Sequence, residues 1–143
     1  MNKFVVDASV AAKWLLPPAD EPFADRAHHL LVRYASQEIQ IVVPDLFWAE
    51  IGNVLWRAAR SGRCSAAEAT TALQSVKAQN FPTVPSTSLL DLAFEIACSS
   101  GHTLYDSLYI ALAEVSQAEF LTADEKLANA LAGRYPIKWL GVL

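Results

Sequence analysis

Four acidic residues occupy positions from which their carboxylates could act together on a phosphate ester. Asp7 and Asp124 each follow a short apolar run that predicts a buried strand, and Glu50 and Asp106 lie in segments with the apolar spacing of helices. An ionised carboxylate beside an apolar face is costly unless it is paired or bound to a metal ion. Carboxylate oxygens suit Mg²⁺ and Mn²⁺, which polarise a phosphoryl oxygen and lower the pKa of a bound water. The acids therefore indicate metal-assisted hydrolysis at a phosphate, with one or two ions.

Each acid also has a structural interpretation. Asp7, Asp106 and Asp124 precede or begin helical segments, where a carboxylate can cap the helix N-terminus. Glu50 could pair with Arg57 or with an arginine of another helix. A capping carboxylate can still bind a metal ion, so these interpretations do not exclude the catalytic one. What they leave unexplained is that all four acids could converge at one edge of a sheet.

Two hydroxyl groups lie close to these acids in the sequence. Ser9 is two residues after Asp7, and Thr122 is two residues before Asp124. A hydroxyl that bonds a metal-binding carboxylate fixes its rotamer, so both residues are candidates for a supporting role. The alternative for Ser9 is a helix-start hydroxyl.

Several basic residues are candidate contacts for an RNA backbone. Lys13 follows Asp7 within two helical turns and could contact a phosphate, or it could be a solvated helix lysine. Arg57, Arg60 and Arg63 form a small basic cluster at a predicted helix end. They could bind RNA phosphates, or they could simply complement the helix dipole.

The elements that would position these residues alternate along the chain. Short β-rich runs predict five strands, at residues 4–6, 39–43, 83–85, 119–122 and 137–140. Apolar spacing and capping signals predict helices at residues 8–16, 22–36, 44–62, 65–79, 88–100, 105–117 and 124–132. This order predicts an α/β fold with right-handed crossovers and a parallel sheet covered on both faces. In such sheets the site lies outside the carboxyl ends of the strands.

Composition narrows the class of protein. The chain of 143 residues predicts a single domain spanning residues 1–143, and its formal charge of −4 argues against simple electrostatic binding of nucleic acid. Only two cysteines, Cys64 and Cys98, are present, which excludes a disulfide framework or a structural zinc site. No long apolar run predicts a membrane span or a secretory leader, so we expect a cytosolic protein that does not enter a membrane. With 53% hydrophobic and 18% charged residues, we expect another subunit or partner to cover some apolar surface.

Four stretches carry a family resemblance. In order along the chain they resemble the acidic motifs of PIN-domain ribonucleases of the VapC toxin family: FVVDASVAAKWL with Asp7, PDLFWAEIGNVL with Glu50, YDSLYIALA with Asp106, and FLTADEKL with Asp124. The motifs hold their order and spacing over essentially the whole chain. The one small departure is Ser107, where alanine is frequent after the third acid.

The resemblance implies a three-layer α/β/α PIN fold with a central, mostly parallel sheet of about five strands. It implies a metal-dependent endoribonuclease in which Asp7, Glu50, Asp106 and Asp124 hold Mg²⁺ or Mn²⁺, with Ser9 or Thr122 in support. It also implies a cognate antitoxin that blocks the site, and commonly a homodimer. It does not name the target RNA.

Other functions are weaker hypotheses. An aspartyl-phosphate phosphatase would need a second Asp two residues after the nucleophile, where this chain has Ser9. A non-catalytic RNA-binding or protein-interaction module would be expected to have a broken acidic set, and this set is complete. His102 could act as an acid or base, although a turn after Gly101 explains it better. The three tryptophans that could stack on RNA bases are better explained by core or subunit packing: Trp14, Trp48 and Trp56.

Overall fold

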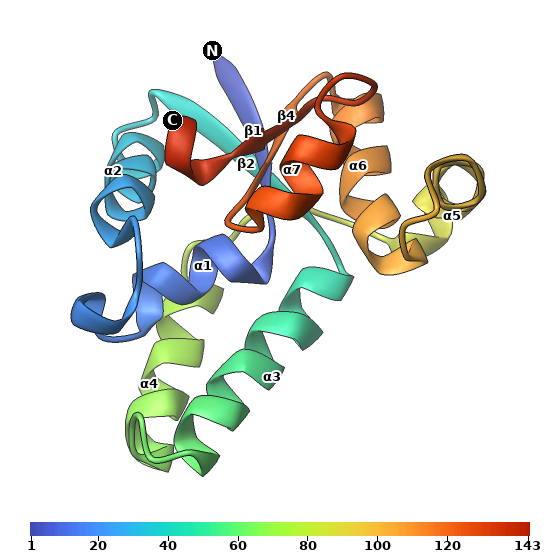
Figure 1. Cartoon of the computed structure of the whole chain (residues 1–143). Helices are drawn as coiled ribbons and strands as arrows, with labels where there is room; N and C mark the ends of the chain where they lie inside the picture. The colour runs from blue at the N-terminus through green and yellow to red at the C-terminus, as the bar shows by residue number, and fades with distance from the viewer.

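The centre of the molecule is a five-stranded sheet, described here from a computed structural model of residues 1–143 (Figure 1). Its strands are β1 (Asn2–Val6), β2 (Ile39–Pro44), β3 (Thr83–Val84), β4 (Glu119–Thr122) and β5 (Ile137–Trp139). They lie in the order β3-β2-β1-β4-β5, and all four pairings are parallel. The expected five strands are confirmed, and the sheet is entirely rather than mostly parallel.

Helices connect the strands and cover the sheet. They are α1 (Ala8–Leu15), α2 (Ala24–Ala35), α3 (Leu46–Arg60), α4 (Ala66–Lys77), α5 (Ser86–Ser100), α6 (Leu104–Ser116) and α7 (Glu125–Leu131), with short 3₁₀ turns η1 (Pro18–Asp20) and η2 (Leu140–Val142). Figure 1 shows α1 and α2 on one side of the sheet and α5 and α6 on the other, which is the expected three-layer arrangement. The pair α3 and α4 projects from the carboxyl end of the strands as a hairpin.

The central strand β1 and the helix α6 are rich in apolar residues because both are buried. On β1, Phe4, Val5 and Val6 are buried in sequence rather than alternately, because helices cover both faces of the strand. Seven consecutive residues of α6, from Ser107 to Ala113, are buried because this helix packs against the sheet and against α5. These residues belong to one continuous apolar core, except that Ser107 places its hydroxyl on the carbonyl of Thr103.

The start of α3 differs from the sequence expectation. Pro44 is the last residue of β2, and α3 begins at Leu46 rather than at the proline. Asp45 does not cap its own helix; it accepts hydrogen bonds from the backbone N–H of Ser86, at 3.1 Å, and from the Ser86 hydroxyl. These bonds lower the pKa of Asp45. The carboxylate of Asp45 thus anchors the first turn of α5, which begins two residues earlier than expected.

The capping box before α4 is confirmed. The Ser65 hydroxyl accepts from the Glu68 N–H at 3.0 Å, and the Glu68 carboxylate accepts from the Ser65 N–H at 2.9 Å. Together the two bonds satisfy two backbone donors at the tip of the α3–α4 hairpin.

Two of the three tryptophans considered above are packing residues. Trp14 and Trp48 both contact the ring of Phe81, and their indole N–H groups donate to the Ala27 carbonyl and the Thr83 hydroxyl. Trp56 is different, because 57% of it is exposed.

None of the helices is long and apolar enough to cross a membrane.

Candidate active site

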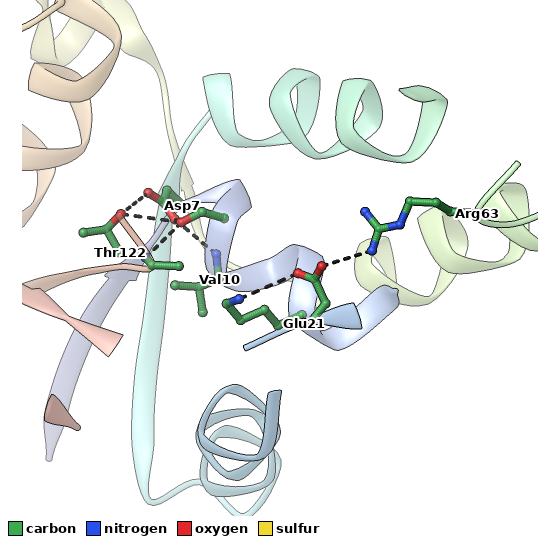
Figure 2. A network of polar contacts seen from close by, with 8 residues as sticks. Asp7, Val10, Glu21, Arg63 and Thr122 are labelled. Carbon is green, nitrogen blue, oxygen red and sulfur yellow. Dashed lines mark hydrogen bonds and ion pairs between the residues drawn. The ribbon is translucent and has the colours of Figure 1, made fainter. Parts of the chain in front are cut away.

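Asp7 lies at the carboxyl end of β1, where the chain turns into α1. Its carboxylate accepts from the backbone N–H of Val10 at 3.2 Å, so the expected N-cap of α1 is present. It also accepts from the hydroxyls of Ser9 and Thr122, at 2.5 and 2.8 Å (Figure 2). Burial raises the pKa of Asp7 to about 6, although these three hydrogen bonds oppose the shift. The side chain is therefore held in one orientation but carries its charge at a cost.

The two hydroxyls expected to support the acids contact Asp7 and each other. The Ser9 hydroxyl lies 3.5 Å from the Thr122 hydroxyl and accepts from the Ala123 N–H at 3.0 Å. The Thr122 hydroxyl accepts from the Asp124 N–H at 3.1 Å. Ser9 is not the cap of α1, because Asp7 has that role. The pair ties the start of α1 to the end of β4 around the carboxylate of Asp7.

Glu50 lies in the first half of α3 and contacts a residue of α6. Its carboxylate accepts from the Tyr109 hydroxyl at 2.5 Å. It forms no ion pair with Arg57 or with any other basic residue, so the alternative that Glu50 is paired with an arginine is wrong. Burial raises the pKa of Glu50, the Tyr109 hydroxyl lowers it, and the charge of Asp106 raises it.

Asp106 and Asp124 complete the set of four acids near the carboxyl ends of the strands. We call this set, Asp7, Glu50, Asp106 and Asp124, the acidic edge. Thr103 rather than Asp106 caps α6, because the Thr103 hydroxyl accepts from the Asp106 N–H at 3.1 Å. Asp106 lies in the first turn of α6, where its side chain is half-buried and the Thr103 side chain lowers its pKa. Asp124 caps α7 as expected, since its carboxylate accepts from the Leu127 N–H at 3.1 Å. Burial raises the pKa of Asp106, the nearby charge of His102 lowers it, and that of Asp124 raises it.

The four carboxylates form an electrostatically connected series. Glu50 raises the pKa of Asp7, Asp106 raises that of Glu50, and Asp124 raises that of Asp106. A neighbouring negative charge favours the protonated form of a carboxyl group. No lysine or arginine forms an ion pair with any member of the series. The structure therefore places the four acids that the sequence singled out as neighbours in a series, with an excess of negative charge.

This donor set fits a hard divalent cation. No three His, Cys, Asp or Glu side chains lie close enough together to enclose a metal ion. Mg²⁺ does not require such a cage, because it usually keeps several waters and uses one or two carboxylates together with substrate phosphates. A divalent cation would neutralise the negative charge of the series, which no lysine or arginine offsets, so the chemistry of the residues present fits a hard divalent cation.

The basic candidates fall into two groups. Lys13 is buried, with its ammonium 3.7 Å from a carboxylate oxygen of Glu21, so the expected solvated lysine is wrong. Glu21 also accepts from Arg63 at 3.1 Å (Figure 2). Arg57 and Arg60 are exposed near the end of α3, and their guanidinium groups form no hydrogen bond or ion pair within the chain.

Tyr109 is a site residue that was not predicted from the sequence. Its ring is stacked on Phe120 of β4, with centroids 5.3 Å apart, and its hydroxyl is aimed at Glu50. Burial, together with the bond to Glu50, raises the pKa of Tyr109, so it stays a hydrogen-bond donor. The available signal was its position three residues after Asp106, which places it one helical turn along the same face.

Comparison with known proteins agrees with this geometry. A family model described as the PIN domain matches residues 4–131. Ribonuclease VapC3 of Pyrobaculum aerophilum is 34% identical over 134 residues, which cover 89% of this chain and 93% of the relative. Ribonuclease VapC9 of Mycobacterium tuberculosis is 32% identical over 133 residues, covering 93% of this chain and 94% of the relative.

Solved structures share the fold. The crystal structure of PAE2754 from Pyrobaculum aerophilum superposes with a TM-score of 0.66 at 26% identity, covering 99% of this chain and 85% of that chain. A toxin–antitoxin complex from Klebsiella pneumoniae has a TM-score of 0.61 at 12% identity and covers 94% of both chains, which supports the fold alone. From the family model, the two relatives and the shared architecture, we conclude that this chain belongs to the PIN-domain family and, within it, to the VapC proteins.

Proposed function

We propose that this protein is a Mg²⁺- or Mn²⁺-dependent endoribonuclease toxin whose activity a cognate antitoxin blocks. The observation that carries the proposal is the series of four neighbouring carboxylates at the carboxyl end of the parallel sheet, none of which is paired with a lysine or arginine. Family membership supports RNA as the substrate, because the relatives described above are named ribonucleases. The complete acidic set argues against the non-catalytic module.

The four acids have the metal-binding role in this proposal. Asp7, Glu50, Asp106 and Asp124 would line the metal site, with one or two of them bound to the ion directly and the others through the waters that it keeps. The ion when bound supplies an activated water and stabilises charge on the phosphoryl group. Ser9 and Thr122 keep the Asp7 carboxylate in one rotamer through the two hydroxyl contacts. Tyr109 does the same for Glu50 from the opposite helix.

The antitoxin partner in this proposal is inferred from solved structures of similar fold. A structure from Klebsiella pneumoniae is described as a toxin–antitoxin complex, and one from Rickettsia felis as VapBC2 bound to a DNA fragment of its promoter. We therefore include a cognate antitoxin in the proposal. A homodimer agrees with the exposed apolar residues Phe94, Val115 and Val142, each more than 60% accessible.

A circular single-stranded RNA tests the endonuclease proposal, because one relative, VapC9 of Pyrobaculum aerophilum, is named an exonuclease. The purified, antitoxin-free protein should convert circles into linear fragments in Mn²⁺ or Mg²⁺ and leave them intact in chelator. Total cellular RNA is assayed in parallel, because an enzyme with a narrow sequence preference could find no cleavage site in the circle. If linear RNA is shortened from its ends while the circle survives, the protein is an exonuclease and the endonuclease proposal is wrong.

Tyr109→Phe tests the support of Glu50 by a buried hydroxyl. Phenylalanine keeps the stacking on Phe120 but removes the donor at 2.5 Å from the carboxylate. Loss of such a supporting bond typically costs 10- to 100-fold in metal affinity or activity, so we expect the Mn²⁺ concentration for half-maximal cleavage to rise roughly tenfold. The KM for RNA should stay constant, and the unfolding midpoint should not fall by more than a few degrees. An unchanged Mn²⁺ requirement would show that Tyr109 has only a packing role.

A further inference from the structure

One face of α3 combines free positive charge with an exposed aromatic ring. It consists of four exposed residues, which we call the α3 face: Asn53, Trp56, Arg57 and Arg60. Trp56 is 57% exposed, and the Arg60 guanidinium carbon lies 5.5 Å from the centroid of its ring. The opposite side of the helix is buried against the core through Phe47, Ile51, Leu55 and Ala58.

The arginines of this face differ from the other arginines of the chain. The guanidinium groups of Arg26, Arg33, Arg63 and Arg134 all contact an oxygen within the chain. Those of Arg57 and Arg60 contact none, and no acidic side chain is paired with them. In a chain with a formal charge of −4, two adjacent uncompensated guanidinium groups form a local site for an anionic partner.

The α3 face is continuous with the acidic edge. At 3.6 residues per turn, Arg57 lies about 20° around the helix from Glu50, and Arg60 lies about 80° away in the same direction. At 1.5 Å per residue, the two arginines are about 10 and 15 Å further along the helix axis than Glu50. Figure 1 shows α3 leading away from the carboxyl end of the sheet. A strand with a phosphate at the acids could thus continue directly onto the two arginines.

We infer that the α3 face binds the single-stranded RNA that flanks the cleaved bond, with Arg57 and Arg60 on phosphates and Trp56 stacked on a base. The inference rests on the proposed function, because it takes the acidic edge as the place of cleavage. Arginine beside an exposed aromatic ring is the combination that single-stranded nucleic acid uses, since the guanidinium groups neutralise phosphates and the ring accepts any base. Along the helix axis, Asn53 lies between Glu50 and the arginines, and its side chain adds an amide donor for the RNA backbone.

The test is RNA binding measured as a function of salt, without cleavage. Fluorescence anisotropy of a labelled mixed-sequence single-stranded RNA, in chelator, is compared for the wild type and Arg57→Ala/Arg60→Ala. Each phosphate contact on a single strand contributes about 0.7 to the slope of log affinity against log salt, so the double variant should lose about 1.4 of this slope. Its affinity at low salt should fall roughly tenfold. Arg57→Lys/Arg60→Lys, which keeps both charges, should retain the wild-type slope.

A matched control separates this face from net charge. Arg33→Ala/Arg134→Ala removes the same two charges at the opposite edge of the sheet, where α2 leads into β2 and α7 leads into β5. We expect this control to keep the wild-type slope. In cleavage assays, Arg57→Ala/Arg60→Ala should raise the KM for RNA about as much as it weakens binding, with kcat unchanged.

The outcomes distinguish this inference from the proposed function. If the wild type cleaves circular RNA but Arg57→Ala/Arg60→Ala keeps the wild-type RNA affinity and salt slope, the proposed function is retained. The inference that the α3 face binds RNA is then wrong. An equal loss in the control pair would also overturn the inference, because binding would then follow net charge. If the wild type neither binds nor cleaves RNA, both proposals fail, and the two arginines serve a protein partner or the helix dipole.

Discussion

Replacing Asp7 with asparagine should reduce RNA cleavage by at least about a thousandfold while leaving the fold intact. Asparagine keeps an oxygen that can accept from the Val10 N–H and the Ser9 hydroxyl, so the cap of α1 is preserved. It removes the one carboxylate that three hydrogen bonds hold in a fixed orientation. A thousandfold loss corresponds to about 4 kcal/mol of transition-state stabilisation, which is in the range that a bound metal ion supplies. Initial rates on the same RNA, at saturating Mn²⁺, measure the effect.

The same substitution should stabilise the metal-free protein at neutral pH. Burial raises the pKa of Asp7 to about 6, so the native state binds its proton more tightly than the unfolded chain does. Stability therefore falls as the pH rises from about 4 to about 6, and a shift of about 2 units corresponds to about 3 kcal/mol at pH 7. Asparagine carries no charge, so Asp7→Asn should recover about 1 to 2 kcal/mol and flatten this part of the pH profile.

Denaturant unfolding in chelator at several pH values between 4 and 7 checks the stability effect. Ser65→Ala, which removes the cap of the distant helix α4, serves as a control that should lower stability by about 1 kcal/mol at every pH. If Asp7→Asn is less stable than the wild type at pH 7, or if it retains full cleavage, the role given to this carboxylate is wrong.

Glu21→Gln should be the most destabilising single change outside the apolar core, at about 3 kcal/mol. The side chain of Lys13 is only 7% exposed and that of Glu21 only 14%, and their charged groups are 3.7 Å apart. Removing one member of a buried pair leaves the other charge without a partner, which commonly costs 3–5 kcal/mol. Glu21 also binds Arg63, so the substitution releases the α3–α4 turn from the body of the protein at the same time.

A double-mutant cycle separates these contributions. Lys13→Met removes the buried ammonium and leaves Glu21 paired with Arg63, so it should cost less than Glu21→Gln. The double variant Lys13→Met/Glu21→Gln should recover most of the loss, because no unpaired buried charge remains. Unfolding in urea gives all three values. A cost below about 1 kcal/mol for Glu21→Gln, with no recovery in the double variant, would contradict a buried ion pair at this position.

The order of elements and the position of the acids were predictable because they depend on local patterns. Buried parallel strands appear as continuous apolar runs, as at residues 4–6, and the strand at residues 119–122 has the apolar pair Phe120 and Leu121 at its centre. Since parallel strands end at the same edge, the acids that follow them had to lie near one another, and the structure places Asp7 and Asp124 around the same hydroxyl of Thr122.

The contacts between distant segments were not predictable in the same way. Lys13 has the sequence context of an exposed helix lysine, and its partner Glu21 lies in a turn whose path only the folded chain defines. Asp45 follows a proline at a predicted helix start, yet it caps a helix 41 residues later in the chain. Tyr109 has the spacing of a core residue, and only the packing of α6 against α3 aims its hydroxyl at Glu50. In each case the hydrogen bond depends on tertiary packing rather than on spacing.

The most direct test of the acidic edge as a cation site is the unfolding midpoint of the wild type and Asp7→Asn at pH 7, with and without Mn²⁺. In chelator, Asp7→Asn should have the higher midpoint. A ligand at 100 times its Kd adds about 2.7 kcal/mol to the stability of the form that binds it. Saturating Mn²⁺ should therefore raise the unfolding midpoint of the wild type by several degrees. It should leave Asp7→Asn nearly unchanged, and the order of the two midpoints should therefore reverse. If millimolar Mn²⁺ moves neither midpoint, or moves both equally, the four carboxylates are not the metal site of this protein.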